Sequence, residues 1–599
     1  MQILSRAITV GLSAIVAIAL FPFFSTQATL LPQRSQTSMV ASASPLASEV
    51  GLQILRQGGN AVDAAVATTL AISVVEPFSA GIGGGGFLLY SQAGHHSKPT
   101  IEALDFRERA PLAATPDMYL DSVGNVRAGQ SLNGHLAVAV PGTIAGLVEV
   151  HRLHGKLAWQ DLVKPAIQLA RAGIPVNQRF VELAKLREAA ILQNPAAKEL
   201  FTHNGSAYAL GEYLKQPDLA KTLEAIARRP QDFYTGKIAE AIARDMRDRG
   251  GIVTKEDLKA YKPIWRSPLC GDFMQTYICS MPPPSSGGVH LLEILNMLGD
   301  GKSWQTLGWH HPDTLHFLTE AFRIAYADRA IHLGDPDFVT VPTAALISPR
   351  YAAHRRQEID LHKATPSQSV KIYDPEALQK LSVKEDAQER YEQIGKLAFL
   401  PQTESLDTSH LTVIDRDRNA VSLTFTVNGP FGASVVVPSM GILLNNEMDD
   451  FAIAPNTPNL FGLVGGTQNQ IAPQKTPLSS MTPVIAFDRD RQNLQFACGS
   501  SGGSTIITQV LQLVLHLLVY GMDAGAAMSA PRLHHQWLPD RLSVERWGLD
   551  IKTLDDLRQR GHKIEERSNW GHANLIVVKA DGSLEGAADP RREGAVLGF

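Results

Sequence analysis

Hydroxyl-bearing side chains gather in one short stretch of the sequence, between Thr408 and Thr426. With a turn centred on Asp417, this stretch forms a β-hairpin in which Thr408 faces Thr426 and His410 faces Thr424. The apolar residues of the same strands then alternate onto the opposite face. A polar face on an otherwise apolar hairpin is either exposed to solvent or a working surface, and strand statistics favour exposure.

A second candidate for chemistry is the glycine pair Gly502 and Gly503, which precedes the apolar stretch 506–522. We expect this stretch to form a buried helix with Ser504 as its N-cap. Backbone N–H groups at a helix start can stabilise an oxyanion, and glycine lets a substrate approach closely. The same residues also suit a simple glycine turn that feeds the helix.

The chain contains 3 cysteines, which are too few for a disulfide framework. A two-residue turn at Met274 and Gln275 places Cys270 opposite Cys279 in a non-hydrogen-bonded pair, where Cα atoms approach closest. One cross-strand disulfide is therefore geometrically allowed. Two free thiols packed as small hydrophobic groups fit the sequence equally well, because Met-Gln is a poor pair for a primed turn.

The elements that must position these residues differ along the chain. Residues 40–260 show mainly helical periodicity, interrupted by glycine-rich loops, whereas short β-branched runs dominate after residue 405. Residues 360–405 are polar and lack a sustained apolar face, which makes them the best linker candidate. We therefore expect an α+β protein whose helix-rich N-terminal part meets a strand-rich C-terminal part near residue 400.

Composition excludes several classes of protein. The 599 residues are 44% hydrophobic and 19% charged, as in ordinary globular proteins and unlike disordered, collagen-like or coiled-coil chains. Lys plus Arg number 55 against 59 Asp plus Glu, and no long basic block could follow a phosphate backbone. We expect no nucleic-acid partner.

Residues 1–28 have the pattern of a secretory signal. A short region ending at Arg6 precedes an apolar run from Ala7 to Phe24 and a small polar segment. We expect an exported protein, periplasmic or extracellular. Thr26 and Ala28 fit a small-x-small cleavage rule, but the apolar run is also long enough for a retained membrane anchor.

Eleven short motifs follow this segment in order. They are GGNAVDAAVA (58–67), GIGGGGF (81–87), DFRERAP (105–111), MPPPSSGG (281–288), DTSHLTVID (407–415), GILLNNEMDDF (441–451), GLVGG (462–466), PLSSMTP (477–483), GSSGGS (499–504), APRLHHQWLP (530–539) and GAADPR (586–591). Each alone is weak. Together, over more than 500 residues, they resemble the γ-glutamyltranspeptidase family.

The resemblance implies an N-terminal-nucleophile hydrolase with a four-layer αββα sandwich. Such a precursor cleaves itself, here between Asp407 and Thr408, into a large chain 29–407 and a small catalytic chain 408–599. Thr408 then acts as nucleophile, and its new α-amine, with a pKa of about 8, can hold the hydroxyl proton. By the family motif Thr426 hydrogen-bonds the Thr408 hydroxyl, in agreement with the hairpin register.

The resemblance also assigns roles around the nucleophile. A γ-glutamyl group carries an α-carboxylate and an α-ammonium, so its pocket needs a cation with hydroxyls and a set of acceptors. The motifs give Arg107, Ser479 and Ser480 for the carboxylate, Asn428, Glu447 and Asp450 for the ammonium, and Gly502 and Gly503 for the oxyanion hole. Neither a metal nor an organic cofactor is implied.

Some positions depart from the family pattern. The stretch 455–466 resembles the lid that covers the pocket in this family. Within it, Phe461 stands where some bacterial relatives have a Tyr. Glu447 stands where some have Gln, and Pro430 stiffens the strand end after Asn428. None of these departures removes an indispensable group.

The expected activity is glutathione hydrolysis and γ-glutamyl transfer through an ester on Thr408. Expected partners are glutathione, other γ-glutamyl compounds and amino-acid or dipeptide acceptors, with the two chains forming a heterodimer. The alternatives are a related acylase of the glutaryl β-lactam type, a poly-γ-glutamate enzyme and an inactive scaffold. Acylases are expected to lack the ammonium acceptors Glu447 and Asp450, while the intact Thr408 and Arg107 argue against a scaffold.

Overall fold

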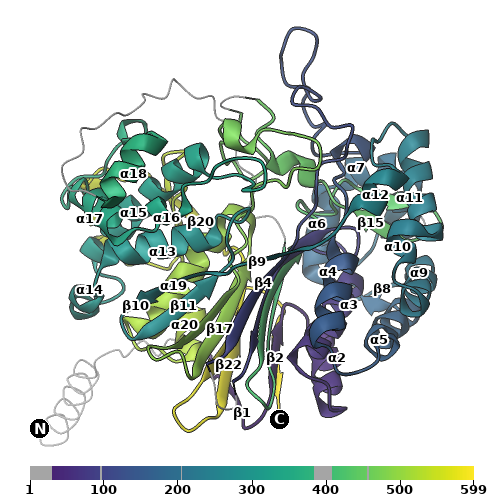
Figure 1. Cartoon of the computed structure of the whole chain (residues 1–599), viewed down its shortest axis with the longest axis horizontal. Helices are drawn as coiled ribbons and strands as arrows, with labels where there is room; N and C mark the ends of the chain where they lie inside the picture. The colour runs from purple at the N-terminus through teal and green to yellow at the C-terminus, as the bar shows by residue number, and fades with distance from the viewer. Residues whose placement is uncertain (1–29, 95–97, 204, 384–407, 455–456) are drawn as a thin grey trace, which may run out of the picture.

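The computed structural model describes residues 30–94, 98–203, 205–383, 408–454 and 457–599. The predicted signal segment 1–28 and Asp407 lie outside the described residues. Two antiparallel sheets of seven strands each pack face to face, and helices cover both outer faces (Figure 1). The predicted α+β class is confirmed at this level.

The first sheet, here called the β12 sheet, contains the hairpin that begins after Thr408. Its order is β23 (Ala595–Gly598), β2 (Met39–Ser42), β12 (Ser409–Ile414), β13 (Ala420–Thr426), β3 (Gly85–Gln92), β4 (Thr100–Phe106) and β9 (Ile264–Arg266). The β12–β13 hairpin thus lies between strands that come from the first hundred residues of the chain.

The second sheet, the β17 sheet, leads to the glycine pair. Its order is β1 (Gln33–Ser35), β22 (Leu584–Ala588), β21 (His572–Val578), β17 (Leu494–Ser501), β16 (Val484–Asp488), β11 (Thr276–Ser280) and β10 (Leu269–Phe273). Both sheets therefore mix strands from before and after residue 400. The expected contrast between a helix-rich N-terminal part and a strand-rich C-terminal part holds, because α2–α18 precede residue 384 whereas β12–β23 lie within residues 408–599. Strands are not confined to the C-terminal part, since β1–β11 also precede residue 384.

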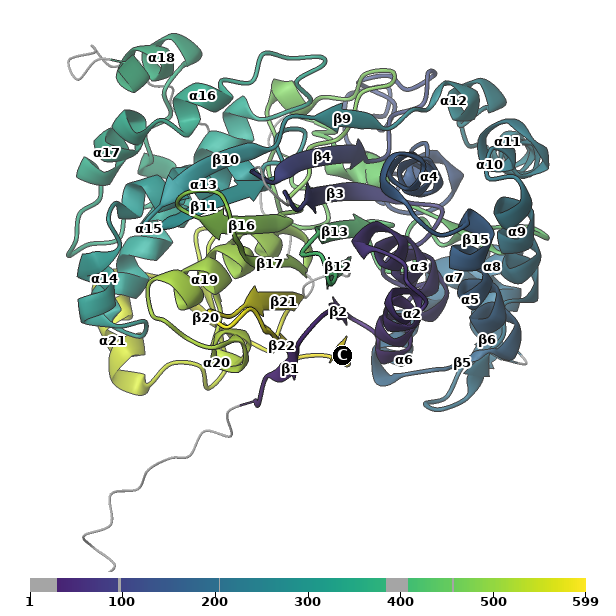
Figure 2. The ribbon, with the colours of Figure 1, turned by 60° about the horizontal axis from the view of Figure 1, so that its bottom comes forward.

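Helices α2 (Pro45–Arg56), α3 (Ala61–Val75) and α4 (Thr143–His154) cover the outer face of the β12 sheet, and α5 (Trp159–Ala172) packs on α3 (Figure 2). Every residue of α3 is buried, and Asn60 with Asp63 forms a capping box at its start. The apolar face of the hairpin, including Leu411 and Leu423, packs into this layer. The apolar residues that alternate along the hairpin are therefore the ones buried against α3 and its neighbours.

Helices α13 (Gly287–Leu298) and α19 (Ile506–Leu518) cover the outer face of the β17 sheet, and α15 (Pro312–His332) packs on α13. The predicted buried helix is confirmed as α19, in which Gln509, Gln512 and His516 are all buried. Within the described ranges, no helix combines the length and the apolar character that crossing a membrane requires.

Shorter elements complete the described chain. The remaining helices are α6 (Gln178–Leu186), α7 (Glu188–Gln193), α8 (Pro195–Phe201), α9 (Pro217–Arg228), α10 (Asp232–Thr235), α11 (Lys237–Asp248), α12 (Lys255–Ala260), α14 (Lys302–Leu307), α16 (Thr343–Leu346), α17 (Pro349–Gln357), α18 (Pro375–Val383), α20 (Ala524–Ser529) and α21 (Ile551–Gln559). The remaining strands are β5 (Ile174–Pro175), β6 (Thr202–His203), β7 (Ser206–Ala207), β8 (Tyr213–Leu214), β14 (Val435–Val437), β15 (Ile442–Leu444), β18 (Leu533–His534), β19 (Leu542–Glu545) and β20 (Ile564–Arg567). Helix α18 lies inside the predicted linker 360–405, so part of that segment is ordered structure.

The predicted hairpin register is confirmed, since His410 pairs with Thr424 and Leu411 with Leu423. The expected solvent exposure of its polar face is wrong, because this face is buried between the two sheets. There the His410 ring and the Thr424 hydroxyl are hydrogen-bonded at 2.8 Å, and Ser422 donates to the Cys498 carbonyl at 2.9 Å. The β17 sheet supplies the polar partners that solvent would otherwise provide.

The cysteine hairpin also has the predicted register. Phe273 pairs with Thr276, and Cys270 pairs with Cys279 at a Cα separation of 4.1 Å. The two thiols form a disulfide, which decides between the two alternatives. Met274 adopts a positive φ of 54°, which is how Met-Gln accommodates the tight turn.

Candidate active site

Residues that are far apart in the sequence converge on one pocket at the edge of the two sheets. All predicted site residues in the described ranges line this pocket except Gly502, which directly precedes the lining residue Gly503. The full lining is Arg107, Arg329, Thr408, Thr426, Asn428, Glu447, Asp450, Phe461, Leu463, Ser479, Ser480, Met481, Gly503 and Ile506. Strands β4, β12, β13 and β17 begin or end at this pocket, so the two sheets together position its chemistry.

Thr408 lies immediately before β12 and is 5% exposed. Its hydroxyl oxygen is 3.3 Å from that of Thr426, the last residue of β13, so the predicted contact is present. The backbone N–H of Asn428 donates to the Thr426 hydroxyl at 2.9 Å. The hairpin register therefore fixes the orientation of the Thr408 hydroxyl.

Arg107 follows β4 and is 1% exposed. Its guanidinium forms ion pairs with Glu447 and Asp450, and its Nε donates to the Pro477 carbonyl at 3.2 Å. Burial alone would lower the pKa of Arg107, but the carboxylates of Glu447 and Asp450 outweigh it and raise that pKa. The residues expected to hold carboxylate and ammonium thus touch each other. This adjacency matches an amino-acid head group, whose two charges are attached to one carbon atom.

The acidic wall comes from a 3-10 turn, Glu447–Asp450, that follows β15. Burial raises the pKa of Glu447 well above its usual range; Arg107 opposes this rise, and Glu108 adds to it. Burial likewise raises the pKa of Glu108 to about 7, again against Arg107. A positively charged ligand group would favour ionisation of these carboxyls.

Asn428 completes the expected ammonium site. Its φ of 73° is in the left-handed region, which asparagine tolerates better than most residues. The side-chain amide donates to the Asn446 carbonyl at 2.9 Å. The amide oxygen is therefore the atom of Asn428 that can accept from an ammonium group.

The sequence did not reveal Glu108 or Arg329 as parts of the site. Glu108 is fully buried. Its neighbours in the motif 105–111 gave no indication that this glutamate would be buried and not exposed. Arg329 lies on α15 and donates through Nε to Ser286 at 3.2 Å; the Ser286 hydroxyl donates to the Ser479 carbonyl at 2.7 Å. Burial lowers the pKa of Arg329 to about 10, so it remains a cation at neutral pH. Most residues of α15 are buried, but this burial comes from packing against other segments and gives no signal in the sequence around Arg329.

The glycine pair follows β17 and precedes α19. Gly502 and Gly503 have positive φ values of 127° and 58°, and a Cβ at residue 503 would lie 2.3 Å from the Phe461 ring. Glycine is therefore required at 503. The predicted N-cap is wrong, because a 3-10 turn over Gly503–Thr505 moves the cap position to Thr505, and the Ser504 hydroxyl donates instead to Gln536 at 2.8 Å.

A segment over the pocket is tied to the acidic wall. Asn459 donates to Asp450 at 3.0 Å, and the backbone N–H of Leu460 donates to Asp449 at 2.7 Å. The carbonyl of Phe461 accepts from Gln536 at 3.0 Å. The predicted lid stretch begins at residues 455–456, which lie outside the described ranges, but its remaining part covers the pocket with Phe461.

Elsewhere in the described part of the chain, one buried group has ligand atoms close enough for a metal ion. His316, Glu320 and His562 place these atoms within 4.8 Å of one another. The two rings are already hydrogen-bonded at 2.7 Å, and Glu320 is ion-paired with Arg323. Nδ1 of His562 is buried without a hydrogen-bond partner, and none of the three residues lines the pocket at Thr408.

Comparison with known proteins agrees with this geometry. The family model for gamma-glutamyltranspeptidase matches residues 47–599. The chain is 43% identical over 562 residues to the glutathione hydrolase proenzyme of Escherichia coli (strain K12), covering 94% of this chain and 91% of that protein. It is 39% identical over 580 residues to the glutathione hydrolase proenzyme of Pseudomonas sp. (strain A14), covering 95% of each.

Two solved structures are also similar. The cephalosporin acylase from Bacillus halodurans has a TM-score of 0.80 at 26% identity, over 97% of this chain and 99% of that chain. The Helicobacter pylori gamma-glutamyltranspeptidase has a TM-score of 0.53 at 41% identity, over 58% of this chain and 97% of that chain. Sequence identity thus favours the transpeptidase relatives over the acylase. The chain belongs to the gamma-glutamyltranspeptidase family.

Proposed function

We propose that the protein is a self-processing γ-glutamyltransferase and glutathione hydrolase that works through a γ-glutamyl ester on Thr408. The observation that carries this proposal is the placement of a threonine hydroxyl beside a buried cation and two buried carboxyls. That combination fits a substrate with an amino-acid head group and a side-chain amide. The relatives named glutathione hydrolase support glutathione as the donor.

Processing would break the bond between Asp407 and Thr408 and leave chains 29–407 and 408–599. The α-amine of Thr408 then takes the hydroxyl proton, and the hydroxyl oxygen attacks the γ-carbonyl carbon. Backbone N–H groups at Gly502 and Gly503 would stabilise the oxyanion. The amine leaving group takes a proton as it departs, and water or an acceptor amine resolves the ester.

Substrate binding would exchange partners within the pocket. The α-carboxylate would pair with Arg107 beside Ser479 and Ser480, and the α-ammonium would pair with Glu447 and Asp450. The direct ion pairs of Arg107 with Glu447 and Asp450 would thereby be replaced by equivalent ion pairs with the substrate. This exchange limits the cost of taking the substrate charges out of water.

An acylase acting on a glutaryl group is the second candidate, supported by the fold of the cephalosporin acylase. A glutaryl group has no ammonium, so Glu447 and Asp450 would gain no partner when it bound. The acidic wall therefore favours a γ-glutamyl donor over a glutaryl donor. No observation favours a poly-γ-glutamate substrate or a scaffold role.

The finer structural expectations belong to the same proposal. The two sheets with their outer helices are consistent with the αββα sandwich of N-terminal-nucleophile hydrolases. Residues 1–28 would direct export to the periplasm or the extracellular space, and the two chains would stay together as a heterodimer.

The deciding experiment combines processing with donor choice. Purified protein should give two bands on a denaturing gel, and the smaller chain should begin at Thr408 on N-terminal sequencing. The cut protein should release amine from glutathione but not from glutaryl amides. An unbroken chain that still turns over glutathione would contradict the mechanism, and preference for glutaryl amides would replace it with the acylase.

A further inference from the structure

The pocket at Thr408 contains two buried arginines, and only one of them is ion-paired. Arg107 forms ion pairs with Glu447 and Asp450. Arg329 also lines the pocket and is 5% exposed, but it forms no ion pair with a carboxylate of the described residues. Buried charges are normally paired, because taking an unpaired ion out of water is costly. Within the described chain, Arg329 is therefore a buried cation without a counter-ion.

The donors of Arg329 are only partly used. Its Nε donates to the Ser286 hydroxyl at 3.2 Å. The two terminal nitrogens carry the remaining N–H donors, and they make no hydrogen bond within the described ranges. Burial lowers the pKa of Arg329 to about 10, and Tyr326 and Asp450 offset only part of this fall. Because Arg329 lines the pocket, its charge and its free donors are available to a bound anion.

The backbone around Arg329 is held in place on both sides. One turn earlier on α15, the Tyr326 hydroxyl donates to the Ser504 carbonyl at 2.5 Å. The carbonyl of Ala330 accepts from the backbone N–H of Gly466 at 2.7 Å. These contacts join α15 to the segment after β17 and to the end of the lid stretch. The guanidinium is thus presented to the pocket from a fixed helix.

The same guanidinium is linked to the serine pair that is expected to bind a carboxylate. The Ser286 hydroxyl that accepts from Arg329 donates to the Ser479 carbonyl at 2.7 Å. The backbone N–H of Ser479 donates in turn to the Pro284 carbonyl at 2.9 Å. Ser479 and Ser480 line the pocket together with Arg329. A guanidinium beside two hydroxyls is the donor set that a carboxylate requires.

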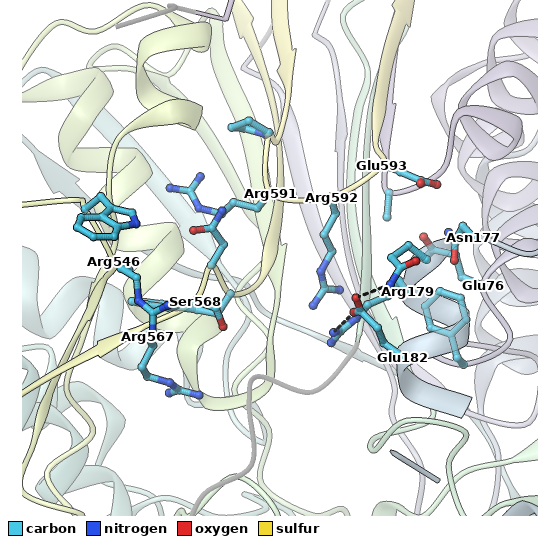
Figure 3. A pocket seen from close by; sticks show the side chains of 17 residues that line it. Glu76, Asn177, Arg179, Glu182, Arg546, Arg567, Ser568, Arg591, Arg592 and Glu593 are labelled. Carbon is cyan, nitrogen blue, oxygen red and sulfur yellow. Dashed lines mark hydrogen bonds and ion pairs between the residues drawn. The ribbon is translucent and has the colours of Figure 1, made fainter. Parts of the chain in front are cut away.

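Other arginines that line a cavity do have carboxylate partners. A larger cavity of about 920 Å³ carries several arginines on its walls (Figure 3). There Arg179 pairs with Glu182, and Arg591 pairs with Glu545. Such pairs satisfy the cations from within the protein, which is the arrangement that Arg329 lacks.

We infer that the terminal nitrogens of Arg329 bind the α-carboxylate of the γ-glutamyl donor, together with Ser479 and Ser480. The inference rests on the proposed function and adds a second cation to the one that Arg107 supplies. Arg107 must exchange its ion pairs when substrate binds, whereas Arg329 has none to break. Arg329 is therefore a specificity-determining residue: a donor without an α-carboxylate leaves this buried cation uncompensated.

The test compares two donors that differ only in the α-carboxylate. One is a γ-glutamyl anilide, and the other is the same compound with its α-carboxylate converted to a carboxamide. In Arg329→Gln, the ratio of kcat/KM for the acid to that for the amide should fall by about tenfold, the scale of a hydrogen bond to a charged group. Arg329→Lys keeps a cation and should retain part of the ratio. Arg558→Gln, which removes an arginine paired with Asp555 on α21, is the control and should keep the wild-type ratio.

Ser286→Ala separates direct contact from positioning. This variant removes the hydroxyl that links Arg329 to Ser479 but keeps the guanidinium in the pocket. The ratio of acid to amide should therefore fall less than in Arg329→Gln. An equal fall in both variants would mean that Arg329 acts only through the serines, and it would overturn the assignment.

A crystal structure of the processed wild type with bound L-glutamate gives a test that needs no variant. An α-carboxylate oxygen should lie within hydrogen-bond distance of a terminal nitrogen of Arg329. A carboxylate bound by Arg107 and the serines alone would overturn the inference, as would an unchanged ratio in Arg329→Gln. If the wild type released no amine from the γ-glutamyl anilide, the proposed function itself would fail.

Discussion

Arg107, Glu447 and Asp450 bring three ionisable groups together at a site almost closed to water. Such burial is tolerated because the groups pair with one another, and removing one partner leaves the others uncompensated. If substrate binds here as proposed, the same property would make the site selective, since a ligand that breaks these pairs must supply both an anion and a cation. An α-amino acid head group does so within one small unit.

Replacement of Arg107 by lysine tests whether the guanidinium binds the substrate carboxylate through two hydrogen bonds. Lysine keeps the charge but loses the planar fork, so kcat/KM for a γ-glutamyl donor should fall by about 30-fold, or about 2 kcal/mol. Steady-state kinetics on the processed variant would measure this. Arg109→Lys, two residues along and outside the pocket, should stay within about twofold of the wild type.

Thr408→Ala should accumulate as a single uncut chain, because it lacks the hydroxyl that the proposed processing and turnover both need. Thr408→Ser keeps a hydroxyl and should still be cut. A denaturing gel followed over days would distinguish the two variants. Normal processing of the alanine variant would contradict the role of Thr408.

Glu108→Gln should change the pH dependence of donor binding. The substrate ammonium needs ionised carboxyls, whose charge appears as pH rises through their raised pKa values, about 7 for Glu108. Removing Glu108 takes away a like charge and lowers the pKa of Glu447. The acidic limb of the kcat/KM profile should therefore move to lower pH. Glu102→Gln, on the outer end of β4, should leave the limb in place, and an unmoved limb in Glu108→Gln would refute the coupling.

At the scale of single elements, both hairpins had predictable registers because alternation and turn position are local properties of the sequence. The burial of the polar face around His410 was not predictable in this way, since its cover comes from β17, about eighty residues further along the chain. Glu108 and Arg329 were missed for a related reason: their burial depends on distant segments. The cap of α19 was misplaced because the 3-10 turn at Gly503 has no distinct sequence signature.

The Cys270–Cys279 disulfide joins β10, the edge strand of the β17 sheet, to β11. The Cys270→Ser/Cys279→Ser variant should lose about 2 to 3 kcal/mol of unfolding free energy by the chain-entropy estimate for a loop of this size. Denaturant unfolding would measure the loss. The wild type under reducing conditions should fall to the same value, and equal stability of all samples would contradict a structural role.

At the scale of the whole molecule, neither of the two proposed chains contains a complete sheet. Strands β12 and β13, which follow residue 407, lie between β2 and β3, which precede it. In the other sheet, β16 pairs with β11 and β22 pairs with β1, so each sheet joins strands from both sides of residue 407. A core built in this way is shared by both chains. Cutting the connection therefore leaves the hydrogen-bonded ladders in place.

Residues 408–599 expressed alone should consequently fail to form a native fold, whereas the cut protein should elute as one species containing both chains. Size-exclusion chromatography with gel analysis, and circular dichroism of the isolated fragment, would check this. Only denaturant should separate the two chains. A folded, monomeric fragment 408–599 would show that the shared sheets are not needed for stability.

The position of Thr408 at the start of an interior strand has one more consequence. The proposed cleavage would make Thr408 a chain terminus; this residue is 5% exposed, and the strand after it is anchored by the ladders from β12 to β2 and β13. Aminopeptidases and N-acetylating enzymes bind several N-terminal residues in an extended conformation. A terminus held inside a sheet has no free residues to place in such an active site. The fold would thereby protect the amine on which the proposed turnover depends from the reactions that trim or block ordinary protein N-termini.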